Sequence, residues 1–253
     1  MTALLETNGL TITFGGVRAV NELDLRVEQG QLVGLIGPNG AGKTTTIDGI
    51  TGFVPAAGRI TFDGELVSTL PAHRRARAGL ARTWQSVELF DDLTIAENLM
   101  VAAETPSWRD VLLDLAWPRR RRDDEVARRG LETLGIAELG DRMPDEISQG
   151  QRKLVGVARA LAATPKLICM DEPASGLDST ESIALGERLR QIVDAGVAIL
   201  LVDHDMGLVL NVCDYIYVVE FGSLIAAGTP AEVSSNPHVI EAYLGTSRSD
   251  GQS

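Results

Sequence analysis

Hydrophobic and polar residues alternate along residues 3–30, and turn signals at residues 15–16 and 29–30 interrupt the alternation. Alternation with a period of two gives a strand one face for a protein core and one face for solvent. The beginning of the chain therefore predicts short antiparallel strands. Residues 58–64 predict one more strand, and residues 215–227 predict a hairpin.

Three short runs are apolar without interruption, at residues 32–36, 167–170 and 198–202. Runs of this length and composition predict strands that are buried on both faces. The second and third runs each follow a helical segment, which is the arrangement of βαβ units in a parallel sheet. The pattern thus predicts an α/β fold.

The stretch from about residue 90 to residue 160 differs from the rest, because it is rich in Ala, Leu, Glu and Arg at helical spacing. Prolines interrupt it near Pro106, Pro118 and Pro144, so we expect a mainly helical insert. The small polar residues 246–253 predict a disordered tail.

The composition restricts the possible functions. The chain has 253 residues, enough for one large domain or a core with a subdomain, and its formal net charge of -12 gives no basic footprint for nucleic acid. Cys169 and Cys213 lack the spacing of a metal site, and Cys169 falls in an apolar run that predicts burial. The sequence has no signal-peptide pattern, and its longest apolar run, residues 197–202, is too short to span a bilayer. If the protein works at a membrane, a partner must hold it there.

A phosphate-loop pattern, Gly-x-x-x-x-Gly-Lys-Thr, lies between a predicted buried strand and a predicted helix. Its glycines let backbone N–H groups approach a β-phosphate, and the helix N-terminus adds its positive dipole end. Lys43 can reach the β- and γ-phosphates, and the Thr44 hydroxyl can bind Mg²⁺. The residues expected to contact the nucleotide are Gly37, Pro38, Asn39, Gly40, Ala41, Gly42, Lys43, Thr44 and Thr45. A Gly-rich turn that matches by chance is the alternative, and the flanking strand and helix argue against it.

Two carboxylates, Asp171 and Glu172, directly follow the apolar run at residues 167–170. The end of a buried strand is where a phosphate-loop ATPase needs an acid to hold Mg²⁺, and Asp171 takes this position. Glu172 could polarise the attacking water. Taken alone, the two residues could equally be solvated acids at a strand end. Together with the phosphate loop, they predict the second half of a nucleotide site.

With these motifs the chain resembles the ATP-binding subunits of ABC transporters over nearly its whole length. Residues 171–178 are similar to the Walker B and D-loop run of that family, residues 201–205 to its switch-histidine segment, and residues 82–85 to its Q-loop. Residues 147–161 resemble its signature motif and helix, and Phe14 lies where the family places an aromatic ring against adenine. The resemblance implies a P-loop NTPase (RecA-like) core with an antiparallel β subdomain and a helical subdomain.

The implied domain organisation is a single ABC ATPase domain over residues 1–245, followed by the tail at residues 246–253. The core and β subdomain would take about residues 1–88 and 161–227, the helical subdomain about residues 89–160, and a C-terminal extension residues 228–245.

The resemblance also assigns roles within the site, with ATP and Mg²⁺ as cofactors. Thr44, Gln85 and Asp171 would hold Mg²⁺, and Lys43, Glu172 and His204 would be catalytic. In a head-to-tail dimer, the residues that would complete the nucleotide site are Ser148, Gly150, Gln151 and Asp178. Without the family, the sequence favours an exposed loop residue for Gln85 and a satisfied turn histidine for His204, and Phe14 could equally be a core residue.

Two features narrow the resemblance to one group of importers. Gln149 replaces the first glycine of the common signature, and subunits of branched-chain amino acid importers often carry a larger residue there. Residues 228–245 closely resemble the C-terminal extension of those subunits. The implied function is an ATP-hydrolysing subunit that powers import of branched-chain amino acids. An importer of urea, short-chain amides or other polar amino acids is the alternative.

The implied partners are integral membrane permease subunits, a second ABC ATPase subunit and, indirectly, a solute-binding protein, but no nucleic acid. The implied location is the cytoplasmic face of the cell membrane, where the permease subunits would hold this chain.

Other classes of protein fit less well. A soluble ABC-type ATPase that acts on DNA or ribosomes usually carries two cassettes or a long coiled-coil insert, and the sequence has neither pattern. A P-loop kinase or GTPase has no use for residues 148–151 or for His204, and the base-reading Asn-Lys-x-Asp pattern is absent from the sequence. The block Arg119–Arg122 before an acidic run fits a solvated helix start, with contact to anionic lipid headgroups as the alternative.

Overall fold

The computed structural model describes residues 3–83, 88–103 and 120–246 of the chain. The chain divides into two compact units, a larger one formed by residues 1–82 and 166–253 and a smaller one formed by residues 83–165. Gln85, Pro106, Pro118, Arg119 and the tail beyond residue 246 lie outside the described residues.

An antiparallel sheet of four strands begins the larger unit, in the order β2-β1-β4-β5. Its strands are β1 (Leu5–Phe14), β2 (Val17–Val27), β4 (Ala57–Phe62) and β5 (Glu65–Leu66). The register pairs Phe14 with Val17 across the tight turn at residues 15–16. The antiparallel strands predicted from the alternating pattern are therefore confirmed.

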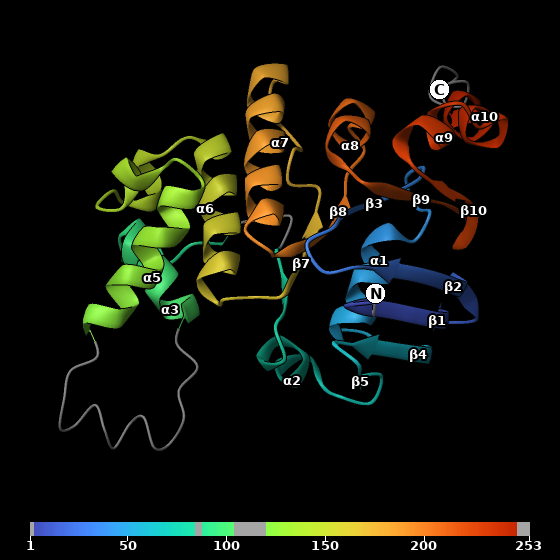
Figure 1. The fold of residues 1–253 in the computed structure, drawn as a ribbon, viewed down its shortest axis with the longest axis horizontal. Helices are drawn as coiled ribbons and strands as arrows, with labels where there is room; N and C mark the ends of the chain where they lie inside the picture. Colours follow the sequence, from blue (N-terminus) through green and yellow to red (C-terminus); the bar gives the residue numbers. More distant parts are fainter. Residues whose placement is uncertain (1–2, 84–87, 104–119, 247–253) are drawn as a thin grey trace. The chain divides into compact units, whose positions relative to one another are not determined.

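A second sheet has six strands in the order β10-β9-β3-β8-β7-β6 (Figure 1). Its strands are β3 (Leu32–Ile36), β6 (Leu80–Arg82), β7 (Leu167–Asp171), β8 (Ala198–Val202), β9 (Tyr215–Glu220) and β10 (Ser223–Gly228). All pairings are parallel except the β9–β10 hairpin. The three apolar runs form the buried strands β3, β7 and β8, as their composition predicts, and the hairpin is also confirmed. The short strand β6 carries no comparable signal in the sequence.

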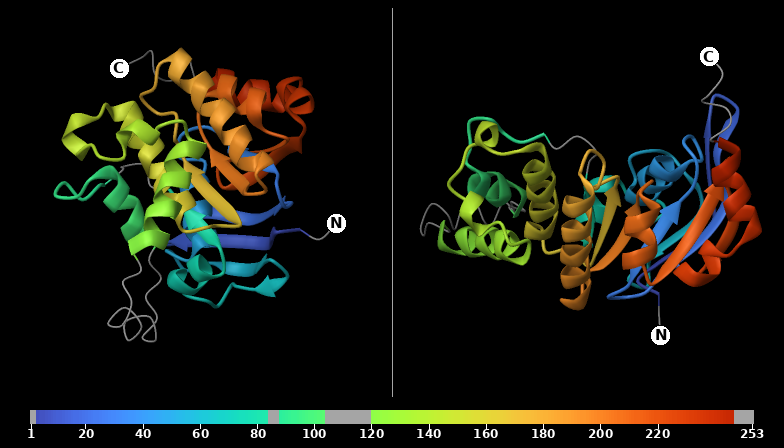
Figure 2. Two further views of the ribbon diagram at one scale, coloured as in Figure 1. Left: turned by 60° about the vertical axis from the view of Figure 1, so that its left-hand side comes forward. Right: turned by 90° about the horizontal axis from the view of Figure 1, so that it is seen from above.

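Helices lie on both faces of this sheet in the larger unit. They are α1 (Lys43–Thr51), α2 (Ala72–Arg77), α7 (Ser179–Asp194), α8 (Met206–Val212), α9 (Pro230–Ser234) and α10 (Pro237–Thr246). Helices α7 and α8 lie on one face, and α1 lies on the other, together with the antiparallel sheet (Figures 1 and 2). Among the described residues, no helix combines the length and apolar character needed to cross a membrane.

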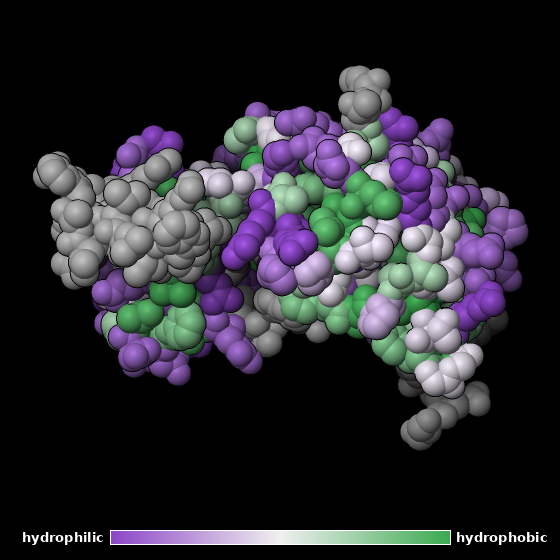
Figure 3. All heavy atoms as spheres, turned by 90° about the horizontal axis from the view of Figure 1, so that it is seen from below, coloured by the Kyte–Doolittle hydropathy of each residue, from purple (hydrophilic) through white to green (hydrophobic). Residues whose placement is uncertain are grey.

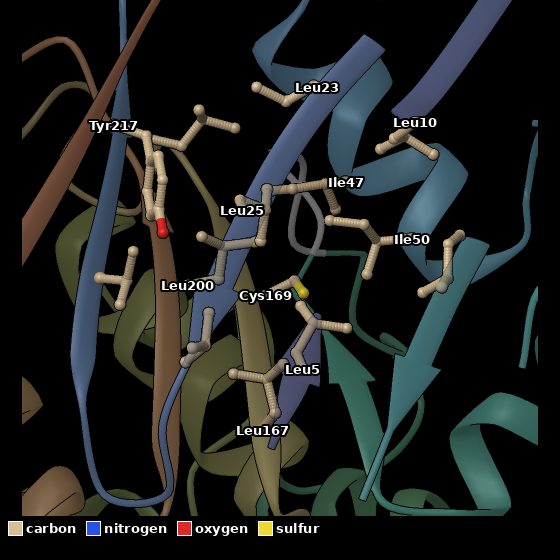
Figure 4. Packing of buried hydrophobic residues seen from close by; sticks show 14 of the residues in the cluster. Leu5, Leu10, Leu23, Leu25, Ile47, Ile50, Leu167, Cys169, Leu200 and Tyr217 are labelled. Atoms are coloured by element: carbon tan, nitrogen blue, oxygen red, sulfur yellow. The ribbon is translucent and has the colours of Figure 1, made fainter. Parts of the chain in front are cut away.

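The core of the larger unit lies between the two sheets, where α1 fills the space beside the strands (Figure 4). Leu5 of β1, Ile47 of α1 and Leu200 of β8 point toward one another and are fully buried. Cys169 lies in the same cluster, and burial raises the pKa of its thiol to about 12. Cys169 is thus a small core residue, as predicted.

The smaller unit is helical in its described part, as the spacing of its apolar residues predicts. It contains α3 (Ile95–Ala103), α5 (Arg120–Thr133) and α6 (Gln149–Ala162), with 3₁₀ turns at Ala137–Leu139 and Pro144–Glu146. The fully buried amide of Asn98 donates to the main-chain oxygens of Phe90, Leu93 and Thr94. This side chain therefore ties the segment before α3 to the helix.

Arg75 of α2 fixes the carboxyl end of α1, the helix that follows the phosphate loop. Its guanidinium is buried and donates to the main-chain oxygens of Gly49 and Ile50 at 2.8 and 2.7 Å. It also donates to the oxygens of Leu70 and Ser68 at 2.8 and 2.9 Å. A cation at the carboxyl end of a helix satisfies free carbonyl groups and interacts favourably with the helix dipole.

Replacement of Arg75 by Met should therefore destabilise the larger unit, because four hydrogen-bonded main-chain oxygens lose their donor. We expect the free energy of unfolding to fall by about 3 kcal/mol in urea denaturation. The matched control is Arg74→Met on the exposed side of the same helix, which should change it by less than about 0.5 kcal/mol. Equal effects of the two variants would contradict this role of Arg75.

Candidate active site

The candidate site lies at the edge of the six-stranded sheet where three neighbouring parallel strands end. The phosphate loop follows β3, the segment 203–205 follows β8, and Asp171 with Glu172 closes β7. Val202 pairs with Leu35 on one side and with Asp171 on the other. The three segments therefore leave the sheet at the same level.

The phosphate loop depends on glycine at its two ends. A Cβ atom on Gly37 would lie 2.0 Å from the main-chain oxygen of Val219. Gly42 has a φ of 98°, and a Cβ atom there would lie 2.2 Å from the main-chain oxygen of Ala19. Neither contact is sterically possible, so the loop keeps its shape only with glycine at these positions.

Helix α1 begins directly after Gly42, and no side chain caps its first N–H groups. Free N–H groups at a helix N-terminus form a binding site for phosphate. The Lys43 ammonium is buried and donates to the main-chain oxygens of Gly37 and Pro38 at 2.8 and 3.0 Å. Burial lowers the pKa of Lys43, and the nearby carboxylates of Glu172 and Asp171 oppose this shift. The Lys43 side chain thus folds back onto the first residues of the phosphate loop.

Thr44 and Asp171, the two expected Mg²⁺ ligands within the described residues, lie together. The Thr44 hydroxyl donates to Oδ1 of Asp171 at 3.2 Å. Burial raises the pKa of Asp171, while the Thr44 hydrogen bond and the nearby Arg82 guanidinium oppose the rise. Two oxygen donors beside a phosphate site suit Mg²⁺, which is usually held by one or two protein groups together with phosphate oxygens.

Glu172 takes a strained backbone conformation, with a φ of 48°. Non-glycine residues rarely occupy this left-handed region, and those that do are often found at functional sites. Its N–H donates to the main-chain oxygen of Val202 at 2.7 Å, which fastens the turn to the end of β8. The side chain is largely covered, at 20% exposed.

His204 presents its ring on the same edge of the sheet. Its Nδ1 lies 3.9 Å from Oε2 of Glu172 and 3.7 Å from Oδ1 of Asp203. The ring is 56% exposed, whereas Asp203 is fully buried. The structure therefore brings together Lys43, Thr44, Asp171, Glu172 and His204, all of which the sequence singles out.

Most of the remaining predicted residues of the larger unit lie at its surface or at a helix start, whereas Ala41 is buried. Phe14 is 49% exposed at the end of β1, so it is not a core residue. Asn39 and Gly40 are exposed at the tip of the phosphate loop, and Thr45 is half-buried in α1. Asp178 caps α7, and its Oδ1 accepts the N–H groups of Thr180 and Glu181, each at 2.8 Å.

In the smaller unit, Ser148 is the N-cap of α6. Its Oγ accepts the N–H of Gln151 at 3.2 Å, and the Gln151 side chain accepts the N–H of Ser148 at 2.9 Å. This capping box satisfies donors at the helix start and places Gln149 and Gly150 in its first turn. Because the Ser148 hydroxyl acts as an acceptor here, its proton can still be donated to an external anion.

Two buried charges of the site are missing from the prediction. Arg82 at the end of β6 is only 6% exposed, pairs with Asp48 of α1 and lies 3.5 Å from Oδ2 of Asp171. The sequence shows Arg82 only as the first residue of a Q-loop resemblance. Asp203 is fully buried, and the sequence shows it only as part of the histidine segment. Nothing in the local sequence indicates which strands neighbour each other. Neither the ion pairs of Arg82 nor the burial of Asp203 could therefore be predicted.

Two sequence families match the chain. The family described as ABC transporter matches residues 20–175, and the one described as Branched-chain amino acid ATP-binding cassette transporter matches residues 223–248. The chain is 41% identical over 251 residues to the high-affinity branched-chain amino acid transport ATP-binding protein BraF of Pseudomonas aeruginosa, which covers 96% of this chain and 98% of the relative. It is 39% identical over 244 residues to the lipopolysaccharide export system ATP-binding protein LptB of Escherichia coli, with coverage of 96% and 98%.

Solved structures give the same result for the fold. A nucleotide-free ATP-binding cassette from an ABC transporter matches with a TM-score of 0.85 and 32% identity, over 96% of this chain and 99% of that chain. The ADP conformation of an ATP-binding cassette matches with a TM-score of 0.84 and 32% identity, over 97% and 100%. The architecture is thus that of a P-loop NTPase core with an antiparallel β sheet and helices, as the sequence predicts.

The two glycines Gly40 and Gly42 provide a test of the loop geometry. Gly42→Ala should lower the free energy of unfolding by more than about 2 kcal/mol, because the new Cβ meets a main-chain oxygen that cannot move away. Gly40→Ala should cost about 1 kcal/mol, because its φ is also positive but no atom lies within 4 Å of the new Cβ. Chemical denaturation without nucleotide measures both, and equal losses would contradict the steric argument.

Proposed function

Because the chain belongs to the ABC transporter family, we propose that it is the ATP-hydrolysing subunit of an importer for branched-chain amino acids. The proposed site rests on one observation: the parallel strands β3, β8 and β7 end at the same edge of the sheet. It supports a single centre made of the phosphate loop, the carboxylate pair Asp171 and Glu172, and His204.

ATP binds through the phosphate loop and the start of α1. The free N–H groups at the helix start face the phosphates, and Lys43 exchanges its two carbonyl partners for β- and γ-phosphate oxygens. Phe14, exposed at the end of β1, stacks on the adenine ring. These contacts bind the substrate and hold the γ-phosphate at the sheet edge.

Thr44 and Asp171 would hold Mg²⁺ in this proposal, since their oxygens are already 3.2 Å apart. The ion would supply positive charge to the phosphate oxygens. Gln85, which lies outside the described residues, is the third proposed ligand.

Hydrolysis then proceeds by attack of water on the γ-phosphorus. The Glu172 carboxylate orients the water and accepts its proton, while the bond between the γ-phosphorus and the β–γ bridging oxygen breaks and ADP leaves. Lys43 stabilises the negative charge that builds up on the phosphate oxygens, and His204 donates a hydrogen bond to the γ-phosphate.

A second ATPase subunit, the same or homologous, completes the proposed site in a head-to-tail dimer. Ser148 keeps a donor proton, and the N–H of Gly150 lies in the first turn of α6, so the start of this helix suits a γ-phosphate. Gln151 supports the arrangement through the capping box. Asp178 belongs to the same proposed interface, where its own role is to fix the start of α7.

The cargo is inferred from the C-terminal segment. BraF and LptB are almost equally similar to this chain, so overall identity does not separate amino acid import from lipopolysaccharide export. The match at residues 223–248 covers β10, α9 and α10 and favours the branched-chain amino acid family. Importers of urea, short-chain amides or other polar amino acids remain the second candidate.

Permease subunits would hold the chain at the cytoplasmic face of the membrane, with a solute-binding protein as an indirect partner. Hydrophobic residues (green) form small groups among hydrophilic ones (purple) on the surfaces seen in Figure 3. Phe53 and Leu66 of the larger unit are 53% and 48% exposed. A protein partner would cover exposed apolar side chains of this kind.

The role of Glu172 is tested by Glu172→Gln. The amide cannot accept the proton of the attacking water, so we expect ATP hydrolysis to fall at least about 100-fold while ATP still binds, and an ATP-bound dimer to accumulate in size-exclusion chromatography. Glu187→Gln, an exposed position on α7, is the matched control and should keep the parental rate. Hydrolysis by Glu172→Gln at the parental rate would remove Glu172 as the base.

The cargo is tested in cells that lack this chain, complemented with the parental chain or with Lys43→Ala. Uptake of labelled leucine, isoleucine and valine should return only with the parental chain, because the variant cannot hold the phosphates. Mild-detergent purification should recover integral membrane proteins together with the chain. Restored urea uptake without leucine uptake, or a defect limited to the lipopolysaccharide of the outer membrane, would overturn the assignment.

A further inference from the structure

One buried carboxylate connects the two turns that carry Glu172 and His204. Asp203 is fully buried, and both its oxygens accept main-chain N–H groups. Its Oδ2 accepts the N–H of Ala174 at 3.1 Å, and its Oδ1 accepts the N–H of Asp205 at 3.0 Å. The carboxylate therefore joins the turn after β7 to the turn after β8.

The turn after β7 requires such a fastening. Glu172 has a φ of 48°, which costs about 1 kcal/mol or more and persists only where neighbouring bonds hold it. One bond runs from the Glu172 N–H to the oxygen of Val202 at 2.7 Å. The bond from the Ala174 N–H to Asp203 lies on the other side of Glu172. Val202 and Asp203, two consecutive residues at the end of β8, thus hold the strained residue Glu172 from both sides.

A second bond supports the same connection farther along the chain. The Ser182 hydroxyl of α7 donates to Oδ2 of Asp205 at 2.9 Å. Oδ1 of Asp205 accepts the N–H of Leu208 and caps α8. His204 therefore lies between two acids that are each bonded to the segment following Glu172.

We propose that Asp203 is the positioning residue that fixes the Glu172 carboxylate relative to the His204 ring during ATP hydrolysis. This inference rests on the proposed roles of Glu172 and His204. Because Asp203 is fully buried and its oxygens bond main-chain N–H groups on both sides, it acts through the backbone and through the His204 ring, whose Nδ1 lies 3.7 Å from its Oδ1, and it does not touch ATP. Its function requires two acceptor oxygens, which only a carboxylate supplies at this position.

Asp203→Asn tests the proposal with an almost unchanged side-chain shape. The amide keeps one acceptor oxygen but turns NH₂ toward the second N–H, so one of the two turns is released. We expect kcat for ATP hydrolysis to fall about tenfold per folded molecule, with KM changed by less than about twofold. Lys43 keeps its hydrogen bonds to Gly37 and Pro38 in this variant, and Asp203 contributes least of the three carboxylates that raise the pKa of Lys43. The folded fraction is measured by binding of a fluorescent ATP analogue.

The matched control is Asp214→Asn, which removes a carboxylate from a main-chain N–H outside the site. Oδ2 of Asp214 accepts the N–H of Leu32 at 2.8 Å. This variant should lower the melting temperature and keep kcat. If Asp203→Asn behaves in the same way, Asp203 has a merely structural role and the proposal is overturned. If Asp203→Asn yields no folded protein, Asp203→Ser, which keeps one small acceptor oxygen, is measured against the same expectation.

A double variant separates this inference from the proposed function. In single-turnover hydrolysis, Asp203→Asn should lower the rate less than about twofold in the Glu172→Gln background, because the group that it positions is already lost. A further tenfold fall in that background would show that Asp203 acts independently of Glu172 and would overturn the proposal. An active Glu172→Gln variant overturns the proposed base itself. An inactive Glu172→Gln beside a fully active Asp203→Asn overturns only the positioning role.

Discussion

Main-chain hydrogen bonds between β3, β8 and β7 set the level at which the candidate catalytic side chains leave the sheet. Val202 pairs with both Leu35 and Asp171, so the phosphate loop and the carboxylate pair begin at the same height. A slip of one residue in either pairing would turn every side chain of the shifted strand to the opposite face of the sheet. The 3.2 Å contact between Thr44 and Asp171 would then be lost, and with it the proposed metal site.

The same edge concentrates charge that must be balanced inside the protein. Burial lowers the pKa of Lys43 and raises that of Asp171, and in both cases neighbouring charges of opposite sign oppose the shift. Arg82 of β6 contributes a positive charge near Asp171, and its side chain is only 6% exposed. Asp203 is balanced differently, because two main-chain N–H groups bind its oxygens. A buried carboxylate with this many donors gives the site a fixed shape before any phosphate enters.

Most of the strands and the nucleotide-binding loop could be predicted from the sequence, because each depends on a short local pattern. The apolar runs became β3, β7 and β8, and the helical spacing became the described helices of the smaller unit. The three-residue strand β6 was missed, since it carries too few residues for any period. The roles of Phe14 and Ser148 and the domain boundaries stay predictions. Gln85 lies outside the described residues.

The sequence by itself determined the chemistry of the phosphate loop, because the spacing of its glycines, Lys43 and Thr44 and the start of the following helix can be read from adjacent residues. Only the tertiary structure decided which distant groups meet that loop. Thr44 and Asp171 are 127 residues apart, and Ala174 and Asp203 are 29 apart. Their contacts follow from strand order, which depends on the burial of the whole sheet between its helices and the antiparallel sheet. Local patterns cannot encode that order, because apolar strands of similar length could pair in several ways.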